Sequence, residues 1–283
     1  MALQSITPEK GVERISSLKK FDLDTKVVEE TQKIFSGKVS SNWNIGGNPN
    51  GGYLISIVTN ALKETVTHPD PFSLTAHFMR SGIADEVCDV EVEVLKAGRS
   101  TETVVSTLSQ RGEDRIRVTA AYGDLDQSLG IEQQIAQGPP EIPDPGNCVP
   151  RTGELQGIEL SLSETVDVRL HPEFFSSDSS ACAESSGWVR FADGRSPDVR
   201  ALILFCDVFP PSPFKKYGVL GWVPTVEMTI HLIKKPAPGW ILGRFRTESL
   251  SNGRMIESGS LWDSSGQQVA ESRQLGLIMK MNR

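Results

Sequence analysis

The sequence is poor in residues that would link the chain covalently or bind a metal ion. Its 283 residues include only four cysteines and four histidines. The cysteines are widely scattered without a CxxC pair, and the histidines lack HxxxH spacing. A disulfide scaffold and a structural zinc site are therefore not expected. We therefore expect a protein that uses no metal and no bound cofactor.

Long hydrophobic runs and an excess of positive charge are also missing. No stretch approaches the ~18 apolar residues of a membrane-spanning helix, and the N-terminus has no apolar core of signal-peptide length. The net charge of −7 opposes general attraction to nucleic acid or anionic lipid. We therefore predict a cytoplasmic protein with reduced thiols, no nucleic-acid partner and no membrane span.

The composition that remains is that of an ordinary globular protein, with 38% hydrophobic and 23% charged residues. A run rich in proline and glycine, residues 137–146, interrupts helices and central strands alike. We therefore predict an N-terminal domain at residues 1–130, a proline-rich linker at 131–155 and a C-terminal domain at 156–283.

Each half of the chain contains one strongly apolar helical segment followed by a series of strands. The first helix is expected to open at Gly51-Gly52, after a turn. The second follows Ser196-Pro197-Asp198, which supplies an N-cap, a first-turn proline and an early acid, and is expected to cover residues 199–209. Proline at positions 210 and 211 must end it.

An internal repeat relates the two halves. Residues 75–80 read Thr-Ala-His-Phe-Met-Arg, and residues 229–234 read Thr-Ile-His-Leu-Ile-Lys, an offset of 154 positions. Two copies of a helix packed on an antiparallel sheet form an α+β protein in which the halves pair as a pseudo-dimer.

The chain resembles the TesB-like acyl-CoA thioesterase (acyl-CoA thioesterase II) family from about Gly37 to Met279. The resemblance rests on Asn50-Gly51-Gly52-Tyr53-Leu54, on residues 78–82 (Phe-Met-Arg-Ser-Gly) and on three motifs in the second half. It implies a double hotdog fold, hydrolysis of acyl-CoA to free fatty acid and coenzyme A, and a role in lipid metabolism. A homodimer or larger homo-oligomer is expected, because hotdog sheets present a long edge.

Three polar residues in the second half are the catalytic candidates. Asp207 interrupts a run that otherwise belongs to the core, and a buried carboxylate needs a partner, either functional or a structural arginine. Thr225 alone would be an ordinary strand residue, and Gln274 stands between the small residues Ser272 and Gly276. The resemblance implies that Asp207, Thr225 and Gln274 together hold the attacking water.

The chemistry of thioester hydrolysis suits these residue types. Asp207 could accept the proton of the water while Thr225 and Gln274 fix its direction. Strict alternation, however, places Thr225 on the strand face opposite the apolar one, so Thr229 is an alternative partner. Backbone N–H groups at Gly51 or Gly52 could stabilise the oxyanion, or the two glycines could simply ease the turn.

The first half lacks an equivalent acid. Asn60 stands roughly where the second half has Asp207, and an amide cannot act as the base. We therefore infer one water-activating centre per chain, with the first domain lining the substrate site.

Two other functions stay open at this stage. The repeated His77 and His231 suit a hotdog enoyl-CoA hydratase, in which a histidine acts with an acid, although each could simply pack on a strand face. A non-catalytic acyl-binding module is the third possibility, since a fold alone does not choose between functions.

Overall fold

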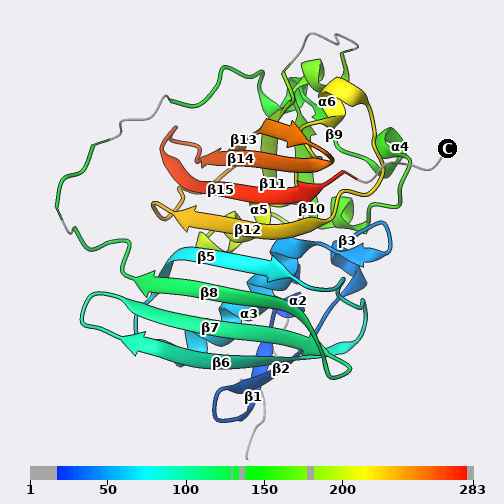
Figure 1. The fold of residues 1–283 in the computed structure, drawn as a ribbon. Helices are drawn as coiled ribbons and strands as arrows, with labels where there is room; N and C mark the ends of the chain where they lie inside the picture. The colour runs from blue at the N-terminus through cyan, green and yellow to red at the C-terminus, as the bar shows by residue number, and fades with distance from the viewer. Residues whose placement is uncertain (1–17, 129, 134–137, 177–181, 279–283) are drawn as a thin grey trace, which may run out of the picture.

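The largest element of the described structure is an antiparallel sheet with the two longest helices on one of its faces (Figure 1). The computed structural model describes residues 18–128, 130–133, 138–176 and 182–278. In the first half the elements are α2 (Lys20–Asp24), β1 (Val27–Thr31), β2 (Ile34–Lys38), η1 (Ser41–Trp43), β3 (Asn44–Ile45), β4 (Asn48–Pro49), α3 (Gly51–Thr65), β5 (Asp70–Phe78), β6 (Val87–Ala97), β7 (Glu102–Gln110) and β8 (Glu113–Gly123).

The second half repeats this order with more short helices. Its elements are η2 (Pro145–Asn147), β9 (Val149–Pro150), α4 (Gly153–Gln156), η3 (Ser161–Glu164), β10 (Val166–Leu170), η4 (Pro172–Phe175), β11 (Glu184–Phe191), α5 (Val199–Phe205), α6 (Phe214–Tyr217), β12 (Thr225–Leu232), β13 (Ile241–Ser251), β14 (Arg254–Trp262) and β15 (Gln268–Leu277). The α+β class predicted from the sequence is confirmed.

The two halves share a continuous sheet. Thirteen of the described strands follow the order β1-β2-β6-β7-β8-β5-β12-β15-β14-β13-β11-β10-β9, and β3 pairs separately with β4. The join is the antiparallel pairing of β5 with β12, near the middle of Figure 1. Thr75 lies directly opposite Thr229 in that pairing, so the repeated segments meet at their equivalent positions.

Helix α3 begins where the sequence predicts. The side chain of Asn50 caps it by accepting a hydrogen bond from the Tyr53 N–H at 2.9 Å. Most of its 15 residues are buried, because the sheet covers one side and α5 the other. No helix within the described ranges combines the length and apolar character needed to cross a membrane.

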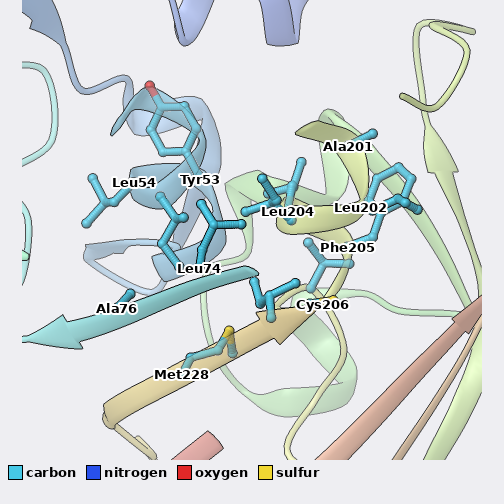
Figure 2. Close-up of a cluster of buried hydrophobic side chains, with 14 of the residues drawn as sticks. Tyr53, Leu54, Leu74, Ala76, Ala201, Leu202, Leu204, Phe205, Cys206 and Met228 are labelled. Carbon is cyan, nitrogen blue, oxygen red and sulfur yellow. The ribbon is translucent and has the colours of Figure 1, made fainter. Parts of the chain in front are cut away.

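Helices α3 and α5 approach each other closely at Gly52. A side-chain carbon added there would lie 3.0 Å from the Leu204 carbonyl oxygen and 3.1 Å from that of Ile203. A larger residue at this position would have to push the two backbones apart by a few tenths of an ångström. Figure 2 shows the core around this contact, formed by Tyr53, Leu54, Leu74, Ala76, Ala201, Leu202, Leu204, Phe205, Cys206 and Met228.

Helix α5 begins at Val199 as predicted, but its N-cap residue and its end differ from the prediction. Its N-cap is Asp198, whose side chain accepts from the Ala201 N–H at 2.8 Å, and not Ser196. It ends at Phe205, four residues earlier than expected. The apolar pattern continues through Phe209, but the Asp207 N–H bonds to the Leu204 carbonyl at 2.9 Å, three residues back, which tightens the chain into a turn.

The predicted linker is only partly without regular structure. Residues 138–144 have neither helix nor strand, as the proline content requires, whereas residues 134–137 lie outside the described part of the chain. Strand β9 and the start of α4 fall inside the predicted range, and β9 extends the sheet beside β10.

Candidate active site

A cavity of about 420 Å³ lies where the two halves meet. Its wall combines apolar side chains with polar groups from six separate parts of the chain. These polar lining residues include Asn50, Gly51, Arg151, Asp207, Thr225 and Gln274. Asp207, Thr225 and Gln274, singled out from the sequence, therefore border the same space, together with Gly51.

Asp207 reaches the cavity from the turn that follows α5. Its Oδ2 accepts a hydrogen bond from the Gly52 N–H at 2.9 Å and another from Asn50 Nδ2, also at 2.9 Å. The same Asn50 amide donates to the Asp207 main-chain carbonyl at 2.7 Å. An acid of the second half is thus held at the N-terminus of α3, where the helix dipole favours negative charge.

The environment of Asp207 places its ionisation in the range of a general base. Burial raises the pKa of this carboxyl to about 6, against the opposing effects of the Gly52 N–H and the positive charge of Arg151. Glu257 adds a smaller upward contribution to that pKa through its negative charge. The carboxylate is therefore ionised at neutral pH yet able to take up a proton there.

Arg151 lies beside the acid in a segment that the sequence assigns to the linker. The guanidinium is buried, borders the cavity and donates through Nη1 to the Val208 carbonyl. Burial lowers the pKa of Arg151 to about 10, so the group stays positively charged at neutral pH. Its charge favours the ionised form of Asp207.

A β-bulge explains how Thr225 reaches the cavity although strict alternation places it on the opposite strand face. The pairing of β12 with β15 shifts by one residue between Thr225 and Glu227, which turns Thr225 to the opposite face from Thr229. Thr225 Oγ1 donates to Gln274 Oε1 at 3.2 Å. Thr229 Oγ1 lies 3.0 Å from Thr75 Oγ1 and donates to Glu227, so it is engaged at the β5–β12 join and does not border the cavity.

The two glycines at the start of α3 have different surroundings. The Gly52 N–H donates to Asp207, and the Gly51 N–H also lowers the pKa of that carboxyl. Of the two glycines, Gly51 borders the cavity. A side-chain carbon on Gly51 would lie 2.8 Å from the Phe78 ring and 3.0 Å from Asp207 Oδ2. The oxyanion role predicted for Gly51 or Gly52 stays a prediction. A side chain at either position would come into close contact with Asp207.

Asn60, the predicted counterpart of Asp207, belongs to a polar network. Its Oδ1 accepts from Arg200 Nη1 at 2.8 Å, and its Nδ2 donates to the Thr25 carbonyl at 2.7 Å. Arg200 also pairs with Asp22 at 2.6 Å. These contacts give Asn60 a structural surrounding that differs from that of Asp207.

His77 and His231 are exposed residues of β5 and β12, and neither borders the cavity. Their nitrogens therefore do not meet Asp207. Both side chains face outward from the sheet and do not pack in its core.

Sequence reasoning missed three residues that shape this site. Asn50 stands in the quoted Asn-Gly-Gly-Tyr motif, and its N-cap position is the signal that could have identified it. Arg151 and Glu257 carry no local signal, because each reaches the site through contacts with distant segments.

Comparison with known proteins agrees with the sequence motifs. The family model for the acyl-CoA thioesterase N-terminal domain matches residues 39–124, and that for the acyl-CoA thioesterase C-terminal domain matches residues 139–278. A putative thioesterase II from Thermobifida fusca is similar in structure, with 28% identity, a TM-score of 0.83 and coverage of 93% of this chain and 99% of that chain.

Two further structures share the fold. A hot dog fold protein of unknown function from Alicyclobacillus acidocaldarius is 22% identical, with a TM-score of 0.78 and coverage of 93% and 98% of the two chains. The acyl-CoA thioesterase II TesB2 from Mycobacterium marinum is 20% identical, with a TM-score of 0.72 and coverage of 93% and 99%. The predicted double hotdog fold is confirmed.

Proposed function

Because this chain belongs to the acyl-CoA thioesterase family and is a thioester hydrolase, we propose that it hydrolyses acyl-CoA to a free fatty acid and coenzyme A. In this proposal Asp207 is the general base, and Thr225 and Gln274 position the attacking water. One observation carries it: these three side chains come from separate segments yet border one cavity, and burial holds the pKa of Asp207 at about 6.

The proposed reaction needs one water molecule and one shuttling proton. As the water oxygen bonds to the thioester carbonyl carbon, Asp207 takes up a proton from it. The tetrahedral intermediate then collapses, the carbon–sulfur bond breaks, and the proton on Asp207 passes to the departing sulfur. Thr225 and Gln274 hold the water in line with the carbonyl, which lowers the entropic part of the barrier.

The first half completes the centre in this mechanism. Asn50 and Gly52 keep the carboxylate of Asp207 in place through their N–H groups. Gly51 borders the cavity with no side chain, so a substrate carbonyl can approach the helix backbone there. We propose this position for the oxyanion.

The proposal is tested by incubating the purified protein with a panel of acyl-CoA substrates and a thiol reagent. Release of free coenzyme A that depends on Asp207 supports it. Loss of enoyl absorbance without thiol release would instead favour the hydratase, and binding without turnover would favour the acyl-binding module.

We further propose two domains at residues 1–130 and 156–283, joined by the linker at 131–155. The same proposal includes a homodimer or larger assembly, a cytoplasmic location and a role in lipid metabolism. Strands β1 and β9 end the described sheet, so each offers an edge for a second copy. Sedimentation at several protein concentrations tests the assembly.

A further inference from the structure

A second carboxylate is buried directly behind the proposed water-binding residues. Glu257 on β14 lies opposite Gln274 of β15 in the strand pairing and is only 4% exposed. Its Oε1 accepts a hydrogen bond from Gln274 Nε2 at 2.7 Å, and its Oε2 accepts from the Ser212 N–H at 2.8 Å. Glu257 is outside the cavity lining and therefore meets the site through Gln274.

These contacts decide which end of the Gln274 amide faces the cavity. An ionised carboxylate only accepts hydrogen bonds, so it selects the NH₂ end of the amide. The carbonyl oxygen is then directed away from Glu257, where it accepts from the Thr225 hydroxyl at 3.2 Å. Thr225, Gln274 and Glu257 thus form a chain in which each hydrogen bond fixes the direction of the next.

The rest of the surroundings supports a fixed position for Glu257. The Ser212 hydroxyl lies 2.7 Å from the Thr247 hydroxyl, which anchors the segment that donates to the carboxylate. Both carboxylate oxygens receive N–H donors, an arrangement that favours the ionised form. Burial nevertheless raises the pKa of Glu257, and the Ser212 and Gln274 hydrogen bonds oppose that effect.

We propose that Glu257 is a positioning residue for thioester hydrolysis, which acts by holding the Gln274 amide with its oxygen toward Thr225 and the attacking water. This inference rests on the function proposed above. With the amide so held, the Gln274 carbonyl oxygen can accept a hydrogen bond from the water. The hydrogen that the water does not transfer to Asp207 makes this bond, which fixes the orientation of the water.

The charge of Glu257 also acts on Asp207. The groups that act on Asp207 include the Asn50 amide, the Gly51 and Gly52 N–H groups at the start of α3, the Arg151 guanidinium that precedes α4, and Glu257 of β14. Arg151 lowers the pKa of Asp207, whereas the negative charge of Glu257 raises it. Removal of that charge should therefore extend activity to lower pH.

The test uses Glu257→Gln, which keeps the size of the side chain but presents an NH₂ group or a neutral oxygen to Gln274. We expect kcat to fall about 10-fold, the worth of one well-formed hydrogen bond, with KM within about twofold of wild type. The acid limb of the kcat/KM profile should move to lower pH. Glu271 on β15 is exposed and accepts a hydrogen bond from Gln268, so Glu271→Gln is the matched control. It should change neither kcat nor the position of the acid limb.

A double variant separates positioning from simple packing. If Glu257 acts through Gln274, the Glu257→Gln change should lower kcat little further in a Gln274→Ala background. An equal loss of kcat in both backgrounds, or wild-type kcat and pH profile in Glu257→Gln, would overturn the proposal.

A shorter acid keeps the proposal testable if Glu257→Gln does not fold. Glu257→Asp retains the charge but withdraws it from the Gln274 amide, so kcat should fall while the acid limb stays in place. Wild-type kcat in that variant would also overturn the inference.

Thiol release by the wild type and its loss in Asp207→Asn test the proposed function separately, since neither measurement involves Glu257. If the wild type releases no thiol, both proposals fail together.

Discussion

The hydroxyl oxygens of Thr75 and Thr229 lie 3.0 Å apart across the join of β5 and β12. These threonines occupy the same position of the internal repeat, so a pseudo-two-fold axis passes between them. The chemistry on the two sides of that axis is unequal. Asp207 receives N–H donors beside the cavity, whereas Asn60 is bonded to Arg200 and Thr25. The proposed chemistry therefore depends on the side of the axis that carries Asp207.

Asp207→Asn should reduce kcat about 100-fold or more, because an amide cannot accept the proton of the water. The protein should remain folded and become more stable at neutral pH. The pKa of Asp207 is raised from 3.8 to about 6 on folding, so the ionised acid destabilises the folded state above pH 6 but not below pH 3.8.

Thermal unfolding at two pH values checks this effect. The variant should gain up to about 3 kcal/mol at pH 7.5 and little at pH 4, given about 1.4 kcal/mol per pH unit. Asp89→Asn on the exposed face of β6 is the control and should leave kcat unchanged. Near wild-type turnover by Asp207→Asn would remove this residue from the mechanism.

The pH profile of kcat/KM should rise with pH through about 6 and then level off, because it reports the ionisation of the base in the free enzyme. Initial rates of thiol release between pH 4.5 and 8 measure it, with stability monitored over the same range. A profile that is flat across pH 6 would contradict the assignment of Asp207 as base.

Thr225→Val and Thr229→Val should separate the two threonine candidates. Thr225 borders the cavity and bonds Gln274, so its loss should lower kcat about 10-fold with little change in stability. Thr229 bonds Thr75 and Glu227, and its loss should cost about 1 kcal/mol of stability while kcat is retained. Steady-state kinetics and urea unfolding of both variants measure these effects. A loss of kcat in Thr229→Val with normal kcat in Thr225→Val would show that Thr229 is the residue that positions the water.

Gly51→Ala and Gly52→Ala should differ in how much activity and how much stability they lose. A methyl group on Gly51 meets the Phe78 ring and Asp207 Oδ2, so activity should fall more than stability. On Gly52 it meets the Asp207 Cβ and the Leu204 and Ile203 carbonyl oxygens. Because these oxygens belong to backbone, about 2 kcal/mol of stability should be lost in addition to activity. Gly47→Ala is the control, because nothing lies within 4 Å of the added carbon. Full activity in Gly51→Ala would contradict this account.

Replacement of both His77 and His231 by Asn should leave thiol release close to wild type, because both side chains are exposed and lie outside the cavity lining. Any effect on stability should be within about 0.5 kcal/mol, as for most surface substitutions. Assays with saturated acyl-CoA and enoyl-CoA substrates measure both reactions. Selective loss of activity in this variant would favour the hydratase alternative.

The parts of the fold that local pattern determines could be predicted from the sequence. The repeat of residues 75–80 in residues 229–234 led to the α+β pseudo-dimer, and the Gly51-Gly52 motif located the start of α3. The end of α5 could not be placed, since the apolar pattern continues through Phe209 while the hydrogen bonds change at Asp207.

The residues that tune the site were harder to predict, because their effects depend on pairing between distant segments. The bulge that redirects Thr225 is a one-residue shift against β15, which strict alternation does not encode. Glu257 looks like any polar residue of an alternating strand until β14 pairs it with Gln274. Arg151 lies in a segment whose composition indicates a linker.

The hydrogen bonds from Asn50 and Gly52 to Asp207 make each half depend on the other for a complete site. The two halves repeat the same kind of unit, but one supplies the hydrogen-bond donors and the other the acid. Recombination that replaced either half with that of a diverged relative would separate the carboxylate from the backbone fitted to it. Inheritance of this centre therefore favours transmission of both halves as one unit.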